Sequence, residues 1–183
     1  MKITLDWLKE KRACPEARQA FRERFGQEAD YQDVLNALGE EDRGDWAKWL
    51  MNTAGSLNIV WEVKGSLEVK HSIFWAGTLR VEGHIRAKFI LAGSGIKAGE
   101  GIEAGSDIKA GWGIKAGEGI KAGEGIEAGW GIKAGEGIEA GWDFGIYAGL
   151  RIRISFKSKY ALVIAKTKPK NLLLGEYPEK EAQ

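Results

Sequence analysis

Three groups of side chains in this chain have the types and the spacing to hold another molecule. Trp112, Trp130 and Trp142 replace the glutamate or serine that otherwise ends a six-residue repeat, and tryptophan is enriched in binding hot spots. The acidic group lies at the corresponding repeat positions and could imitate a line of phosphates; it comprises Glu100, Glu118 and Glu136, with Glu124 at a further corner. The basic group lies near the C-terminal end and could meet nucleic acid or an acidic protein; it comprises Arg151, Arg153, Lys157 and Lys159. We predict that the partner-binding residues belong to these three groups.

Groups that could carry catalysis are scarce. His71 and His84 are the two histidines, and we expect both to be corner or surface residues. The many Gly-x-Gly strings lie in a β-type repeat with no helix after them, so they do not predict a dinucleotide site. We therefore expect no catalytic residue, no metal site and no cofactor, and we do not expect an enzyme.

A six-residue phrase, G-I-[KE]-A-G-[EWS], repeats from residue 90 to residue 141 and must position these side chains. Isoleucine recurs every six residues from Ile90 to Ile138, and alanine follows two residues after each isoleucine. A fixed short period is typical of a solenoid, in which each repeat buries its apolar face only against its neighbours. Because six residues are too few for a helical unit and glycine opposes helix, the phrase predicts a short strand and a tight corner. At the corners we expect the glycines to adopt positive φ angles.

The charges between the isoleucines and the alanines indicate how many repeats make one turn. Side chains on adjacent turns stack about 4.8 Å apart, so like charges in one column are disfavoured. Turns of three repeats give more opposite-charge neighbours than turns of two repeats; their columns are Lys97-Lys115-Lys133, Glu103-Lys121-Glu139 and Lys109-Glu127. We therefore favour a triangular solenoid with an 18-residue turn over a flattened roll with a 12-residue turn. The 18-residue register places Trp112 and Trp130 on one edge, whereas the 12-residue register pairs Trp130 with Trp142.

The segments on either side of the repeats also read as strands. Residues 57–89 alternate between apolar or small side chains and polar ones, which is the β pattern. The spacing from Ile85 to Ile90 is five residues instead of six, so a corner or a bulge must absorb the slip. After the repeats, alternation resumes in residues 151–156 and predicts an end strand that closes the solenoid.

Residues 1–55 read as a small helical domain. Thr4 can cap a first helix, Pro15 and Gly26 suit the two ends of a second, and Gly39 and Gly55 suit the ends of a third and a fourth. The apolar residues recur at spacings of three and four, so the helices share a small core that packing on the solenoid would enlarge.

The predicted fold class is α+β and mainly β: a single-stranded β-helix of hexad repeats with a small N-terminal helical domain. The predicted boundaries are 1–55 for the helical domain, 56–154 for the solenoid, and 155–183 for a C-terminal strand cap and tail.

Charge and cysteine content indicate the compartment in which the protein is expected to occur. The net charge is only +1, but residues 91–150 carry −4 and residues 151–183 carry +5. Cys14 is the single cysteine, so no intrachain disulfide can form and a reducing cytoplasm is the expected compartment. The N-terminus has no apolar leader and no apolar run has membrane-spanning length, so we expect no membrane contact.

Three resemblances add to this picture. The stretch from residue 65 through residue 87 resembles bactofilin-type polymer-forming β-helices, which are non-enzymatic scaffolds. The repeat resembles that of hexapeptide-repeat acyltransferases when Ala116 is taken as the first position and Ile120 as the fifth, which implies a trimer with a catalytic histidine. The opening residues 3–8, with Ala13 and Cys14 after them, look like short helical modules of small phage and prophage proteins. Such proteins are often inhibitors of host defence, anti-CRISPR proteins among them.

These observations predict a non-catalytic protein that binds a protein or a nucleoprotein complex, in the favoured setting of a phage-type inhibitor of host defence. Direct contact with nucleic acid through the basic C-terminal strand is compatible with the sequence, and so is a homodimer. The alternatives are a bactofilin-like scaffold and a hexapeptide-repeat acyltransferase.

Overall fold

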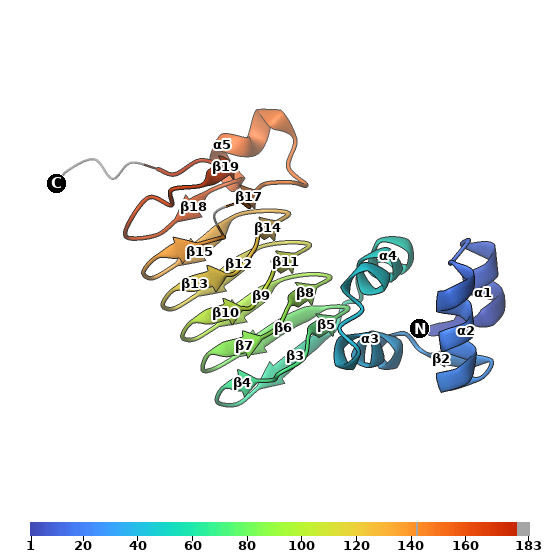
Figure 1. Ribbon diagram of the computed structural model, residues 1–183. Coiled ribbons are helices and arrows are strands. Elements are labelled where there is room, and N and C mark those ends of the chain that lie inside the picture. Colours follow the sequence, from blue (N-terminus) through green and yellow to red (C-terminus); the bar gives the residue numbers. More distant parts are fainter. Residues whose placement is uncertain (142, 179–183) are drawn as a thin grey trace.

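The computed structural model describes residues 1–141 and 143–178, which form a helical domain beside one end of a β-solenoid (Figure 1). The helices of the first domain are α1 (Leu5–Glu10), α2 (Pro15–Phe25), α3 (Tyr31–Glu40) and α4 (Gly44–Ala54). Two short strands that the sequence did not predict, β1 (Lys2–Thr4) and β2 (Glu28–Asp30), form an antiparallel pair. Within the described residues, no helix has the length and apolar character needed to span a membrane.

The predicted helix ends are largely confirmed. The Thr4 hydroxyl accepts a hydrogen bond from the backbone N–H three residues on, at 3.1 Å, and so caps α1. Gly26 and Gly55 follow α2 and α4 with φ angles of 76° and 82°. The prediction for Gly39 is wrong, because this residue lies inside α3. A side chain there would meet the Ser72 carbonyl oxygen at 2.5 Å, so glycine allows the helix to approach the solenoid.

The solenoid has three parallel sheets, which we name after what their outer surfaces carry. The lysine face contains β3 (Val60–Val63), β6 (Thr78–Val81), β9 (Ile96–Ala98), β12 (Ile114–Ala116), β15 (Ile132–Ala134) and β18 (Val163–Ile164). The mixed-charge face contains β4 (Leu67–Glu68), β7 (Ile85–Ala87), β10 (Ile102–Ala104), β13 (Ile120–Ala122) and β16 (Ile138–Glu139). The helix-covered face contains β5 (Ile73–Trp75), β8 (Ile90–Ala92), β11 (Ile108–Ala110), β14 (Ile126–Ala128), β17 (Ile146–Ala148) and β19 (Leu172–Leu174).

Strand pairing confirms the triangular solenoid with its 18-residue turn. Ile102 pairs with Ile120, and Ile120 pairs with Ile138, so each isoleucine lies above the one three repeats earlier. The isoleucines and alanines of the repeat are buried and form one continuous core along the axis. The lysines and glutamates between them point outwards, as alternation requires.

The repeat glycines serve a different purpose from the predicted one. Among the described glycines, positive φ occurs only at Gly26, Gly55, Gly65, Gly149 and Gly175, none of which belongs to the regular repeats. In the repeats, the glycine directly after each alanine mostly lies against a backbone carbonyl of the preceding turn, and a Cβ there would come well under 3.0 Å from it. Close approach between turns, rather than dihedral freedom, therefore requires glycine at this position.

The slip in the alternation is absorbed at a corner. Ile73 pairs with Ile90, so this turn is one residue shorter than the regular turns, and the corner after β7 contains only Lys88 and Phe89. Phe89 is buried and lies edge-on to Phe74, at 5.3 Å between ring centroids, in the core of the helical domain. The shortened corner thus supplies an aromatic side chain to the contact between the two domains.

The prediction of a strand in residues 151–156 is wrong. The chain turns at Gly149, whose φ is 83°, and forms the 3₁₀ helix η1 (Ile154–Phe156) and the helix α5 (Lys157–Tyr160). A strand needs a free edge to pair with, and the edge of β15 is already paired with β18. Residues 150–161 therefore leave the sheet before the chain returns as β18.

The helical domain closes one edge of the first turn. The Gln32 side chain donates to the Phe74 carbonyl at 2.9 Å and accepts from the Ala76 N–H at 2.9 Å. The Gln32 side chain therefore pairs with backbone groups at the outer edge of β5, as a further strand would.

Asp42 forms a second link between the two domains. Its Oδ1 accepts from the backbone N–H and the hydroxyl of Ser72 at 3.0 and 2.7 Å, and its Oδ2 accepts from Lys88 at 2.7 Å. The hydrogen bond from Lys88, together with those from Ser72, lowers the pKa of Asp42 below its ordinary value.

Candidate binding surface

Two of the three predicted tryptophans form an exposed edge. The Trp112 N–H donates to the Ser94 carbonyl at 3.0 Å, and the Trp130 N–H donates to the Trp112 carbonyl at 3.1 Å, so both occupy one corner on successive turns. Their exposed fractions are 59% and 47%. Among the described residues, Trp112 has no aromatic ring against its own. Trp142, the third prediction, lies outside the described residues.

The segment after the solenoid extends this edge with two more aromatic side chains. Tyr160 of α5 lies against Trp130 at 5.4 Å between ring centroids, and Phe156 lies 6.5 Å from Tyr160. Phe156 is 51% exposed and Tyr160 is 39% exposed. We call these four residues the aromatic edge: Trp112, Trp130, Phe156 and Tyr160. Exposed aromatic side chains from two separate segments of the chain thus gather at one place, which is unusual for a surface without a partner.

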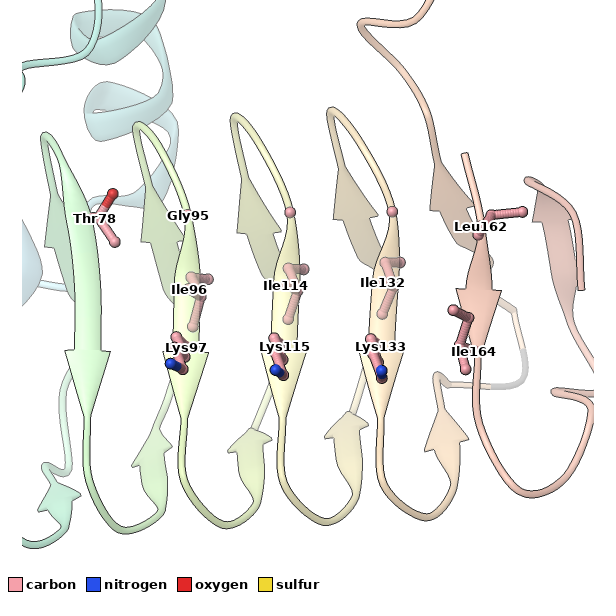
Figure 2. Close-up of a pocket in the computed structure, with 12 residues that line it drawn as sticks. Thr78, Gly95, Ile96, Lys97, Ile114, Lys115, Ile132, Lys133, Leu162 and Ile164 are labelled. Carbon is pink, nitrogen blue, oxygen red and sulfur yellow. The ribbon is translucent and has the colours of Figure 1, made fainter. Parts of the chain in front are cut away.

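The face next to this edge carries a column of like charges. Lys97, Lys115 and Lys133 pair directly across β9, β12 and β15, and Figure 2 shows the three side chains in one line. All three are exposed, and none forms an ion pair within the described part of the chain. Adjacent members lie about 4.8 Å apart, where two like charges in water repel by about 1 kcal/mol or less. We call these residues the lysine column.

A shallow groove of about 400 Å³ runs along the lysine column (Figure 2). Gly95, Gly113 and Gly131 line it and expose backbone, and Leu162 and Ile164 line its end near β18. Two of these glycines directly follow the tryptophans of the aromatic edge in the chain. The groove therefore runs between the aromatic edge and the lysine column, with no bulky side chain in its glycine stretch.

Three of the four predicted acidic residues line the opposite corner of the lysine face, whereas Glu124 lies at the corner between β13 and β14. The backbone N–H groups of Glu118 and Glu136 donate to the carbonyls of Glu100 and Glu118, both at 3.2 Å, so the three form a glutamate column. Glu136 has an ion-pair partner in Lys166 at 3.6 Å, and Glu100 lies 3.5 Å from His84. Each lysine of the column therefore lies three residues from an aromatic or small corner residue on one side and three from a glutamate on the other.

The predicted basic residues lie close to the aromatic edge, although not on a strand. The Arg151 side chain passes over Gly111 and Gly129, which lie next to the two tryptophans in the chain. The Lys159 ammonium lies 5.1 Å from the centre of the Tyr160 ring. Within the described residues none of the four predicted basic side chains forms an ion pair; they are Arg151, Arg153, Lys157 and Lys159.

The other two faces neutralise their charges, which distinguishes the lysine face from them. On the mixed-charge face the outward column alternates strictly in sign along Glu68, Arg86, Glu103, Lys121 and Glu139. Arg86 and Glu103 form an ion pair at 2.9 Å. The column of like charges on the lysine face is therefore not a general property of this repeat.

On the helix-covered face, charges are partly buried and paired. Lys109 donates a hydrogen bond to Glu127 and lies 3.5 Å from Asp107, whose Oδ1 accepts from the Gly125 N–H at 3.1 Å. Burial alone would lower the pKa of Lys109, but the hydrogen bond to Glu127 and the charge of Asp107 raise it. Lys48 of α4 reaches Asp107 at 3.8 Å, so this cluster joins the helical domain to the solenoid.

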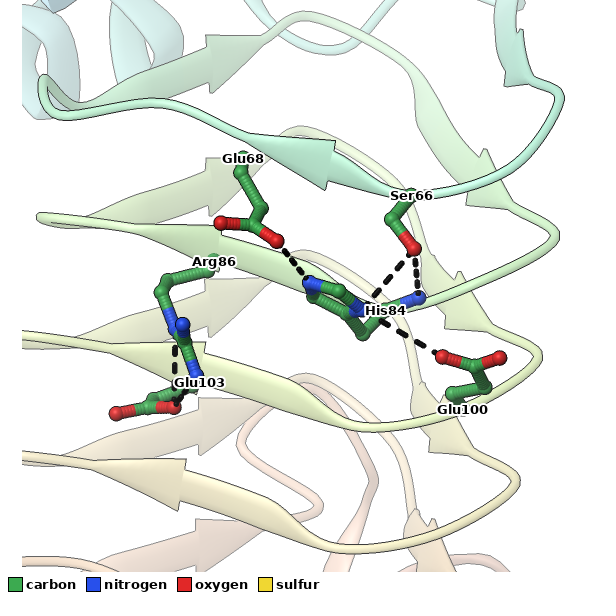
Figure 3. Close-up of polar contacts among 6 residues, drawn as sticks. All are labelled: Ser66, Glu68, His84, Arg86, Glu100 and Glu103. Carbon is green, nitrogen blue, oxygen red and sulfur yellow. Dashed lines mark hydrogen bonds and ion pairs between the residues drawn. The ribbon is translucent and has the colours of Figure 1, made fainter.

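His84 belongs to a polar cluster on the mixed-charge side that has the residue types of a hydrolase (Figure 3). Its Nε2 lies 2.6 Å from Glu68, and its Nδ1 lies 3.0 Å from the Ser66 hydroxyl and 3.5 Å from Glu100. A serine, a histidine and a carboxylate in contact are the components of a nucleophile–base pair. Here the Ser66 oxygen also accepts from the His84 backbone N–H at 3.2 Å, and the partners come from three successive turns. These contacts join three successive turns of the solenoid.

Sequence reasoning identified the two tryptophans but missed Phe156 and Tyr160. Their signal was available, because both are aromatic residues within a run of basic ones, which is atypical of a buried strand. It also described the lysine column without assigning it to the site. The signal for it was the cost of stacking three like charges, which a repeat of alternating sign would avoid.

The fold defines the class of this protein as a β-solenoid with an N-terminal helical domain. Residues 1–58 match the family model described as the YdhT N-terminal domain. This match covers the helical domain from β1 to α4 and ends just before β3. The comparison with curated proteins found no match, and the comparison with solved structures found none either.

Proposed function

We propose that this chain is a non-catalytic binding protein that holds a macromolecular partner against its aromatic edge and the adjacent lysine column. The observation that supports it is the gathering of four exposed aromatic side chains at one corner of the solenoid. Large aromatic residues supply most of the binding energy at many interfaces. The unpaired lysines beside them would favour a negatively charged partner and would speed its association with this surface.

The helical domain favours this proposal over a bactofilin-like polymer. Stacking of solenoids end to end needs open strand edges on all three faces. Gln32 already satisfies the edge of β5, so a second solenoid at that end would find one of its three sheets closed.

The corners of the solenoid favour it over an acyltransferase. Every corner between β8 and β16 spans three residues, so no inserted loop builds a pocket for an acceptor substrate. His84 is engaged by Glu68 and Ser66 and ties turns together.

We place this binding protein in the setting of a phage-type inhibitor of a host defence complex, an anti-CRISPR-like role in the cytoplasm. The support is the resemblance of residues 3–14 to helical modules of small phage proteins. In addition, the aromatic edge and the lysine column could cover a surface of the partner. An inhibitor of this kind needs no chemistry, because occupying the partner's surface is sufficient.

A pull-down with matched variants tests the proposal. The immobilised full-length chain is incubated with lysate of its source cells, and bound material is compared with that held by Trp112→Ala/Trp130→Ala and by Lys121→Ala. Lys121 is an exposed lysine on the mixed-charge face. We expect a specific partner that the double tryptophan variant loses and the lysine variant retains.

Equal retention by both variants would contradict the proposed surface. Light scattering after size-exclusion chromatography checks the alternatives on the same sample. A monomer of 20.1 kDa or a dimer is expected, whereas filaments would support the scaffold and a trimer would support the acyltransferase.

A further inference from the structure

We propose that the partner of this surface is a single-stranded nucleic acid, with bases stacked on the aromatic edge and phosphates on the lysine column. This inference rests on the proposed function, because it names the chemical class that the same surface would hold. It uses the lysine column on the flat face of the solenoid, and not a basic C-terminal strand, which does not form.

The aromatic edge has rings that an unpaired base can reach. Trp112 is more than half exposed and, among the described residues, has no aromatic ring against it. Trp130 lies one turn further along the axis, and Tyr160 lies against it. Proteins that bind single strands combine such stacking platforms with a cationic groove, because every base has a flat π-face.

The spacing of the lysine column fits one phosphate per turn of the solenoid. Successive lysines lie about 4.8 Å apart, whereas one strand of a stacked duplex advances about 3.4 Å per nucleotide. A single strand lengthens when its bases unstack, so its phosphates can match the wider spacing. The groove beside Lys97, Lys115 and Lys133 runs along the axis and is lined by glycines and isoleucines, so the sugars of a strand can lie against it while the phosphates lie at the lysines.

The remaining charges set the path of the strand. The glutamate column repels phosphates from the far side of the lysine face, and it leaves the side next to Trp112 and Trp130 favourable. Beyond the tryptophans, Arg151 lies over Gly111, and Lys159 lies by Tyr160. Cations therefore border the aromatic edge on both sides.

Other polyanions fit this surface less well. A duplex keeps its bases paired and stacked, so it would meet the lysines with its phosphates and leave the tryptophans unused. An acidic peptide would also pair with the lysines, but its carboxylates offer no flat ring for Trp112. The exposed aromatic edge is thus the feature that selects unpaired bases.

Fluorescence anisotropy with labelled oligonucleotides tests the inference on the full-length chain. The probes are a dT12 single strand, a U12 single strand and the dA12·dT12 duplex, each titrated at several salt concentrations. We expect both single strands to bind more tightly than the duplex, and their relative affinities assign the surface to DNA or RNA. Three lysine contacts predict a slope of log K against log salt of about −2 for a single strand.

Two variants and a control separate the parts of the surface. Trp112→Ala should weaken dT12 binding about 5- to 150-fold, the range for one stacked base. Lys115→Ala should reduce the salt slope by about 0.7. Lys121→Ala, on the mixed-charge face, should change neither quantity. Thermal melting of each variant confirms that the fold is retained.

Several results would overturn the inference: no binding of either single strand, equal binding of duplex and single strand, or equal losses in Lys115→Ala and Lys121→Ala. Displacement of dT12 by poly-glutamate as effective as that by unlabelled dT12 would assign the surface to an acidic protein instead. If the oligonucleotides fail while the pull-down still captures a protein that Trp112→Ala/Trp130→Ala loses, the nucleic-acid inference is wrong and the proposed function stands. Failure of both experiments would remove both.

Discussion

The two glycines of the corner between β12 and β13 should respond in opposite directions to the same substitution. Gly117 and Gly119 lie in one corner, on either side of Glu118, and neither has a positive φ. A Cβ on Gly117 would come well under 3.0 Å from the carbonyl oxygen of Gly99 on the preceding turn. A Cβ on Gly119 would lie 3.6 Å from the nearest atom, the carbonyl oxygen of Gly137, which is an ordinary contact.

The difference can be estimated from these contacts. In Gly117→Ala the obstructing atoms belong to backbone, so the turns must separate, and overpacking of this kind costs about 1–3 kcal/mol. In Gly119→Ala the native conformation is open to alanine, and reduced freedom of the unfolded chain stabilises by about 0.4–1 kcal/mol. The two variants should therefore differ in free energy of unfolding by about 1.4–4 kcal/mol. For a chain of this size that gap corresponds to roughly 3–16 °C in melting temperature.

Thermal unfolding followed by circular dichroism measures this directly on the two purified variants and the wild type. We expect Gly117→Ala to melt below the wild type and Gly119→Ala to melt at or slightly above it. Equal losses in both variants would show that the corners need glycine for its dihedral freedom, and the argument from close approach would fail.

Two further predictions concern the interior and the contact between the domains. Ile120→Asp should lower the free energy of unfolding by several kcal/mol, because it buries a carboxylate where the wild-type side chain is 1% exposed. Lys121→Ala should change the free energy of unfolding by no more than about 0.5 kcal/mol. Equal melting temperatures for the two variants would contradict the assignment of isoleucine to the interior and lysine to the surface. The lowered pKa of Asp42 means that its stabilising contribution is present above pH 3.8 and is lost as the pH falls through the lower folded value. The Asp42→Asn variant should therefore lose less stability than the wild type when the pH is lowered below that value. If melting temperature falls with decreasing pH in the same way for both proteins, the ionised Asp42 carboxylate does not stabilise the contact between the domains.

The solenoid was predictable because the six-residue period indicates both which side chains are buried and how strands on adjacent turns pair. Isoleucine and alanine at every sixth position define the buried side, and the alternating signs of Glu103, Lys121 and Glu139 select three repeats per turn. The role of the glycines was not predictable. The sequence shows where the glycines are. Only the distance between turns shows which of the two glycines in a corner cannot be replaced by a larger residue.

The C-terminal segment shows where pattern reasoning ends. Arg151, Ile152 and Arg153 alternate as a strand would, but alternation says nothing about whether an edge is free to pair. β18 occupies that edge, so residues 150–161 fold away from the sheet and bring Tyr160 to Trp130. The aromatic edge depends on this path through space, and for this reason only its tryptophans were found from the sequence.

Photo-crosslinking from single positions shows directly whether the partner is held at the aromatic edge. A photoreactive benzoylphenylalanine replaces Trp130 in one variant and Lys121 in another, and both are expressed at equal levels in the source cells. We expect a discrete adduct from position 130 and none from position 121. Adducts from position 121 alone, or equal adducts from both, would show that the binding surface lies elsewhere on the solenoid.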